Sequence, residues 1–94
     1  GIMRGSPTEL LTKNVEKNVL EITGSQTLET IADSAMLQKV RIDRTQETTR
    51  VYCDDDQLLR NLAGLLKDTH YFLRQTTLED VFLKATGRGL NEKQ

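Results

Sequence analysis

The sequence contains few of the residues that build reactive or membrane-embedded sites. Its 94 residues include one cysteine, one histidine, one proline and no tryptophan. One cysteine rules out an internal disulfide and a zinc site made of several thiolates. Apolar runs are at most two or three residues long, which is too short to cross a bilayer, and no basic stretch followed by an apolar one marks a secretory signal. A reducing, cytosolic setting is therefore the expectation.

The balance of charge also argues against nucleic acid as a partner. Lysine and arginine number 13 and aspartate and glutamate 14, which gives a net charge of −1. A nucleic-acid-binding module normally carries a basic surplus on one face, and two tyrosines and two phenylalanines are too few to stack on bases. A typical domain has about 100–200 residues, so this length leaves room for one hydrophobic core. We expect a single mixed globular domain that binds no nucleic acid.

Nucleotide-binding motifs are missing. None of the glycines is followed by lysine, so the phosphate-binding Gly-x-x-x-x-Gly-Lys-Ser/Thr loop is absent. The Gly87 and Gly89 pair follows a predicted helix rather than a strand, which is the wrong context for dinucleotide binding. Gly87 is better interpreted as the residue that ends that helix.

The titratable residues give no catalytic, cofactor or metal site. His70 has no partners spaced for a metal site or a catalytic triad, so a structural or surface role is favoured. Cys53 sits in an alternating pattern and is expected to be a half-buried small hydrophobe, with a reactive thiol as the weaker alternative. Residues 54–56 are three aspartates without the glycine and glutamate of a calcium loop, so they are expected to cap a helix.

The chain alternates between strand and helix patterns. Strands are expected where apolar and polar residues alternate, over residues 19–23, 37–43, 48–53 and 71–75. Helices are expected where apolar residues recur at helical spacing, after a cap at Ser25 through Ala35, from Asp54 to about Thr69, and from Thr77 to Gly87. Leu58, Leu59, Leu62, Leu65 and Leu66 form the apolar stripe of the second of these helices.

Two capping boxes mark helix starts. Ser6 precedes Pro7 and Glu9, which predicts a short helix at the N-terminal end. Thr77 precedes Asp80 in the same way, and Asp80 is expected to reach back to the cap.

The resulting order is β-α-β-β-α-β with a short helix before it and a helix after it. This order predicts an α+β fold of the ferredoxin-like, split β-α-β type, with four antiparallel strands and two helices on one face. The terminal helix is expected to cover part of the other face. The remainder is expected to meet another copy or a larger neighbour. The alternative is a polar face in water, which Glu21, Lys39, Arg41 and Arg50 would suit.

The end of the chain resembles a known family. Residues 77–88, TLEDVFLKATGR, are similar to the C-terminus of ATP-binding subunits of ABC transporters of the ABC-2 export type, including the nodulation (NodI) and daunorubicin-resistance groups. Residues 5–11 resemble the segment after the last strand of their nucleotide-binding domain, and residues 2–4 resemble the remnant of that strand. The hairpin that contains Glu47 and the Tyr52–Cys53 pair also resemble the nodulation group.

The resemblance implies three segments. Residues 1–13 would be a remnant and connector from an upstream ATPase domain, residues 14–90 a ferredoxin-like accessory domain with its terminal helix, and residues 91–94 a frayed tail. ATP and Mg would bind upstream, so this domain is expected to be non-catalytic and to hold no cofactor. A departure is the approach at Thr76 and Thr77, where relatives often carry proline.

The resemblance also implies partners and a location. The partners would be the ATPase domain of the same chain, a second copy in a homodimer and the membrane permease subunit, with no direct insertion into the membrane. The location would be cytoplasmic, peripheral to the inner membrane. Two roles are expected: the domain would support dimerisation of the ATPase, or it would couple the ATPase to the membrane subunit. A ferredoxin-like small-ligand sensor or an oligomerisation module is the alternative.

Three residues of the shared phrase are candidate contacts. Glu79, Asp80 and Phe82 match the family's ending and would touch a partner under the functional interpretation. The structural interpretation treats the two acids as first-turn helix residues and Phe82 as a core aromatic. The structural interpretation is the favoured one.

Overall fold

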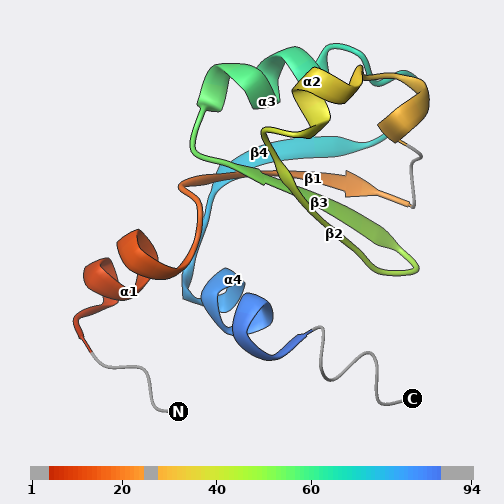
Figure 1. The fold of residues 1–94 in the computed structure, drawn as a ribbon. Helices are drawn as coiled ribbons and strands as arrows, with labels where there is room; N and C mark the ends of the chain where they lie inside the picture. Colours follow the sequence, from red (N-terminus) through yellow and green to blue (C-terminus); the bar gives the residue numbers. More distant parts are fainter. Residues whose placement is uncertain (1–4, 25–27, 88–94) are drawn as a thin grey trace.

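A computed structural model describes residues 5–24 and 28–87 of the chain. Its elements run in the order α1 (Pro7–Asn14), β1 (Asn18–Thr23), a 3₁₀ turn (Leu28–Thr30), α2 (Ser34–Leu37), β2 (Arg41–Arg44), β3 (Thr48–Cys53), α3 (Asp56–Ala63), β4 (Tyr71–Gln75) and α4 (Leu78–Phe82), which continues as a π-helical turn over Leu83–Gly87 (Figure 1). Among these elements no helix is long and apolar enough to span a membrane.

The four strands form one antiparallel sheet in the order β2-β3-β1-β4. This is the strand order of the ferredoxin-like fold, so the predicted α+β class is confirmed. β1 lies in the middle, where Val19 pairs with Tyr52 of β3 on one side and with Arg74 of β4 on the other. β2 and β4 are the two edges.

Helices cover both faces of the sheet. In Figure 1, α2 and α3 lie on one side of the strands, and α1 and α4 lie together on the other. Under α3, a core cluster forms around Leu20, Ile22, Leu28, Val51, Cys53, Leu59, Leu62 and Ala63. Against α1 and α4, a smaller cluster joins Val15, Val19, Tyr52 and Val81. Alternation along β1 therefore buries both of its faces, since Val19 and Leu20 are both fully covered.

The helix predicted from a cap at Ser25 through Ala35 is wrong in its extent. The described part of that segment forms a 3₁₀ turn at Leu28–Thr30 and a separate short helix, α2. The reason is Asp33, whose carboxylate accepts a hydrogen bond of 2.8 Å from the Met36 N–H and so starts a new helix. Since Leu37 belongs to α2, the strand predicted from residue 37 begins only at Arg41. The predicted cap, Ser25, lies outside the described residues.

The helix predicted from Asp54 to about Thr69 is too long. Asp55 caps α3 by accepting hydrogen bonds from the N–H groups of Gln57 and Leu58, as expected of the aspartate run. The helix ends at Ala63 rather than near Thr69, because Gly64 disfavours helix and the backbone tightens beyond it. Leu65 is consequently 40% exposed instead of part of the buried stripe.

Both capping boxes are present. The Ser6 N–H donates to Glu9 Oε1 at 2.9 Å, and the Glu9 N–H donates to Ser6 Oγ at 3.2 Å. Asp80 Oδ2 accepts from the Thr77 N–H at 2.8 Å, so the carboxylate reaches back as predicted. The helical turn that follows α4 runs to Gly87, the last described residue. The predicted strand remnant at residues 2–4 and the tail at residues 91–94 lie outside the described residues.

Candidate interaction surface

The carboxylate of Asp80 joins α4 to the sheet. Asp80 is 1% exposed, and its two oxygens accept hydrogen bonds from the Tyr52 hydroxyl at 2.8 Å and from Arg74 Nη1 and Nη2 at 2.8 and 3.1 Å. The Thr77 N–H is a further donor. A buried charge is tolerated only when it is paired and hydrogen-bonded, and Asp80 meets both conditions. The side chain therefore holds α4 against β3 and β4.

Arg74 extends this contact along the sheet. Its Nε donates to Glu21 Oε1 at 3.1 Å, while the same guanidinium holds Asp80. Glu21 pairs in register with Arg50, and Arg50 Nε lies 3.7 Å from Glu21 Oε2. That distance is an ion pair without a hydrogen bond, and Arg50 Nε is buried without a hydrogen-bond partner among the described residues.

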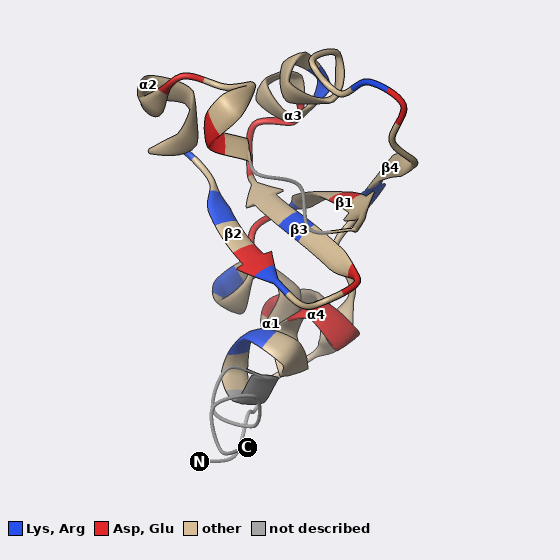
Figure 2. Ribbon diagram, turned by 90° about the vertical axis from the view of Figure 1, so that its right-hand side faces the viewer, with Lys and Arg blue, Asp and Glu red and all other residues tan. Residues whose placement is uncertain are grey.

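Arg41 continues the network to the other edge of the sheet. Its guanidinium lies 4.1 Å from the centre of the Tyr52 ring, a cation–π contact, and it also binds Glu16 through Nε and Nη2. Figure 2 shows charged residues on each of the four strands. Of the residues predicted for an open face, Glu21 and Arg50 thus pair with each other and Arg41 pairs with residues outside that set. Lys39 is exposed and lies before β2.

Burial and hydrogen bonds shift the pKa values of the central groups. Burial alone would raise the pKa of Asp80, but the hydrogen bonds from Arg74, Thr77 and Tyr52 outweigh it and lower the pKa to about 2. Burial and the bond to Asp80 raise the pKa of Tyr52 above its usual value of 10. The hydrogen bond to Asp80 raises the pKa of Arg74. Asp80 and Arg74 are therefore both charged at neutral pH, and Tyr52 keeps its proton.

The three predicted contact residues lie on two faces of α4. Asp80 points into the protein beside Val81, whereas Glu79 and Phe82, three residues apart, are exposed. Phe82 is 52% exposed, so its interpretation as a core aromatic is wrong. The apolar stripe that buries α4 consists of Val81 and Leu78 instead. The exposed pair is left as the surface that a partner could meet.

Tyr52 and Arg74 were missed by sequence reasoning. The available signal was the alternation of β3, which puts Arg50 and Tyr52 on the face opposite Val51 and Cys53. The terminal helix is expected on that same face, which brings Asp80 toward Tyr52, but the alternation does not give the position of α4 along β3. The register between β1 and β4, which puts Arg74 at the same level, is decided only by the folded sheet.

The other candidate residues have the structural surroundings that were favoured. Cys53 is buried, and its sulfur accepts from the Asp55 N–H at 3.4 Å. His70 is exposed. Asp54 differs from the expectation of a helix cap, since it accepts from the Lys17 N–H before β1 at 2.8 Å and leaves the cap of α3 to Asp55. Across residues 5–24 and 28–87, no group of three or more His, Cys, Asp or Glu side chains could hold a metal ion.

Two open hollows flank β4. One, of about 390 Å³, lies between α1 and the ends of β1 and β4, and the other, of about 420 Å³, lies between α3 and β4. Asn18 and Gln75 line both. Neither contains a histidine or cysteine in its lining.

The fold and its surface define a small α+β domain whose polar side chains hold its own layers together and whose outer helix face is exposed. Residues 25–87 match the family described as nodulation factor export protein NodI, C-terminal domain. The chain belongs to this family, as the resemblance of its ending implied.

Curated relatives agree with this family. The chain is 32% identical over 97 residues to the Nod factor export ATP-binding protein I of Ralstonia nicotianae, and 34% identical over 92 residues to the protein of the same name from Mesorhizobium japonicum. Each alignment covers 97% of this chain but only 30% and 26% of the respective relative, so the chain spans less than a third of their length. No solved structure matches the chain significantly.

Proposed function

We propose that this chain is the non-catalytic accessory domain at the C-terminus of an ATP-binding subunit of an ABC-type export system. The observation that carries the proposal is the family match over residues 25–87 together with relatives named as export ATP-binding proteins. In this proposal ATP and Mg bind to the upstream part of the subunit. This domain makes contacts and performs no chemistry.

The polar network supports a scaffold role. A catalytic site needs charged groups that face a substrate, whereas Asp80, Arg74 and Glu21 face one another. Their hydrogen bonds hold α4 to the sheet in one orientation. A fixed α4 can present its outer face, with Glu79 and Phe82, to a neighbour.

The position of α1 points to the neighbour. Under this proposal α1 forms most of the connector from the ATPase domain, and it packs against α4 through Leu11 and its cap residue Val15. Figures 1 and 2 both show the two helices side by side. We assign the ATPase domain of the same chain as the partner, because α1 leads from it to the side of α4. The subunit would be cytoplasmic, held at the inner membrane through the permease.

The test compares the complete ATP-binding subunit with a form that lacks residues 14–94. We expect both to hydrolyse ATP, and we expect the shortened form to respond less to the membrane subunit or to dimerise less. Steady-state ATPase rates with and without the permease in vesicles measure the first effect, and sedimentation with ATP measures the second. An unchanged response in both assays contradicts the accessory role.

A second experiment addresses the non-catalytic part. ATP–Mg is titrated into the 94-residue chain while amide chemical shifts are followed. We expect no saturable shifts, since the chain has no phosphate-binding loop. Saturable shifts clustered on one surface, or release of phosphate by the chain, would count against the proposal.

The outer face of α4 is tested by substitution in the complete subunit. Phe82→Ala removes the exposed ring, and Leu65→Ala removes an exposed leucine on the opposite side of the sheet as a matched control. We expect Phe82→Ala to weaken the response to the permease and Leu65→Ala to leave it unchanged. Equal behaviour of the two variants would exclude this face as the contact.

A further inference from the structure

The outer edge of β4 presents backbone N–H and carbonyl groups that pair with no backbone group of the described residues. The Thr23 N–H donates to the His70 carbonyl, and the Thr76 N–H donates to the Lys17 carbonyl. The even-numbered residues just before and just after β4 therefore direct their backbone groups toward β1. Antiparallel strands alternate these groups between their two sides. The N–H and carbonyl groups of Tyr71, Leu73 and Gln75 therefore point away from the sheet. One of these carbonyls, that of Gln75, accepts from Arg74 Nη1 at 3.2 Å and keeps a second lone pair.

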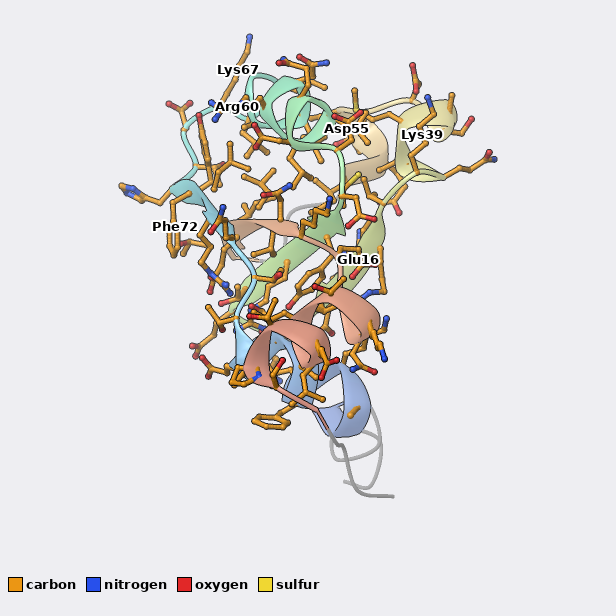
Figure 3. The ribbon with its side chains drawn as sticks, turned by 90° about the vertical axis from the view of Figure 1, so that its left-hand side faces the viewer. Glu16, Lys39, Asp55, Arg60, Lys67 and Phe72 are labelled. Atoms are coloured by element: carbon orange, nitrogen blue, oxygen red, sulfur yellow. The ribbon has the colours of Figure 1, made fainter. Side chains whose placement is uncertain are left out.

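The two edges of the sheet differ in their side chains. β2 has the sequence Arg-Ile-Asp-Arg, and charged residues on an edge discourage pairing with another strand. β4 has the sequence Tyr-Phe-Leu-Arg-Gln, with a single charge. Both of its aromatic side chains are exposed, Tyr71 at 43% and Phe72 at 55%. Figure 3 shows Phe72 on the β4 side of the molecule, away from Lys39. β4 is thus the edge suited to receive a strand.

We propose that two copies of this domain pair through β4, antiparallel, about a two-fold axis at Leu73, to form one continuous sheet. A second copy is the occupant because the strand is complementary to itself in this arrangement. Tyr71 faces Gln75 of the second copy, Leu73 faces its own equivalent, and each of these pairs can exchange two backbone hydrogen bonds.

The side chains select this register. With the axis at Leu73, Phe72 lies opposite Arg74 of the second copy in a close pair without backbone bonds, so no charge faces a like charge across the axis. An axis at Arg74 would set two arginines opposite each other, a like-charge pair that is unfavourable. An axis at Phe72 would pair only part of the strand. Only the axis at Leu73 pairs all of Tyr71–Gln75 and keeps the charges apart.

The consequence for the exporter rests on the proposed function, since paired accessory domains would hold two ATP-binding subunits together. The strand pairing itself is tested separately on the 94-residue chain. A monomeric chain would overturn the pairing and leave the accessory role intact. ATP hydrolysis by the chain would do the reverse.

The sharpest test uses single cysteines. Tyr71→Cys and Gln75→Cys chains are mixed, oxidised and weighed by mass spectrometry. In the proposed register the two positions are about 5.5 Å apart between Cα atoms, within reach of a disulfide. Two copies of position 71 are about 14 Å apart, beyond that reach. Cys53 is buried and does not compete.

We expect the mixed disulfide to dominate and the chains with identical substitutions to cross-link little. Cross-linking of identical chains at least as readily as mixed ones would overturn the proposal, as would no cross-linking at all. Both substituted side chains are exposed, so the variants are expected to fold. Circular dichroism confirms this before oxidation.

Sedimentation of the chain gives an independent result. We expect a dimer that dissociates on dilution, and we expect Phe72→Lys to give a monomer because lysine would face Arg74 of the second copy. Phe82→Lys is the matched control, since it changes an equally exposed phenylalanine outside β4. A dimer disrupted by Phe82→Lys and not by Phe72→Lys overturns the proposal.

A different occupant would also be recognised. If the 94-residue chain is monomeric while the amides of Tyr71, Leu73 and Gln75 are protected from hydrogen exchange in the complete subunit, then another part of the subunit covers the edge. In that case the ATPase domain, and not a second copy, would be the partner that covers the edge of β4. Protection of these amides in the chain alone, lost on dilution, supports pairing of two copies.

Discussion

The Tyr52 hydroxyl donates a 2.8 Å hydrogen bond to the Asp80 carboxylate, across a separation of 28 residues. This contact joins a central strand to the last helix. Arg74 completes it from the edge strand β4, so one buried carboxylate fixes the position of α4 relative to two strands. This contact holds α4 over part of the face of the sheet that the β-α-β-β-α-β order leaves open.

Replacing Asp80 should destabilise the domain. In Asp80→Asn the amide presents its NH₂ group to donors, and the Arg74 guanidinium loses its main anion. We expect a loss of about 2–4 kcal/mol in the free energy of unfolding. Urea unfolding followed by circular dichroism measures this. Glu79→Gln, an exposed neighbour, is the control and should change stability by less than about 0.5 kcal/mol.

The stability due to Asp80 should depend on pH. Its pKa is lowered from the usual 3.8 to about 2, so the contribution is fully present above about pH 4 and is lost as the pH falls toward 2. The shift corresponds to about 2 kcal/mol. We expect the stability difference between the native chain and Asp80→Asn to shrink over this interval. A difference that stays constant from pH 5 to pH 2 would show that the charge of Asp80 is not responsible.

Tyr52 should resist alkaline titration. Burial and the negative charge of Asp80 raise the pKa of Tyr52 above 10, so the folded state favours the protonated phenol. The stability linked to this proton is present below pH 10 and is lost as the pH rises through the folded-state pKa. In a Tyr71→Phe chain, Tyr52 is the remaining tyrosine. We expect phenolate absorbance to appear only with alkaline unfolding; a smooth titration near pH 10 in the folded protein would contradict the buried bond.

Leu62 and Leu65 should respond differently to truncation. Both belonged to the predicted stripe, but Leu62 is fully buried under the sheet and Leu65 is 40% exposed after the end of α3. We expect Leu62→Ala to cost about 2–5 kcal/mol through the cavity that it leaves. Leu65→Ala should cost less than about 1 kcal/mol. Thermal unfolding measures both, and equal losses would mean that α3 extends past Gly64.

Local patterns predicted much of the fold. The strands at residues 48–53 and 71–75 have the bounds that alternation indicates, and the boxes of Ser6 with Glu9 and Thr77 with Asp80 start helices as expected. These signals involve neighbours in the chain, so a short stretch of sequence contains them completely.

Predictions failed where two local signals competed. Apolar spacing favoured one helix from residue 25, but Asp33 starts a new turn within it. The leucine stripe favoured a helix beyond Gly64, but the chain leaves the helix there. Phe82 was expected to face the core, yet Val81 occupies that position and Phe82 is exposed. Helical spacing alone does not decide which of two adjacent apolar residues faces the sheet.

The order of the elements, the caps of α1, α3 and α4 and the family were determined by the sequence alone, because each depends on residues that are close together in the chain. The charged network of Asp80, Tyr52, Arg74 and Glu21 was decided only by the tertiary structure. These side chains come from four separate elements and meet only once the strand register and the position of α4 are set. Their mutual contacts therefore depend on the folding of the whole domain.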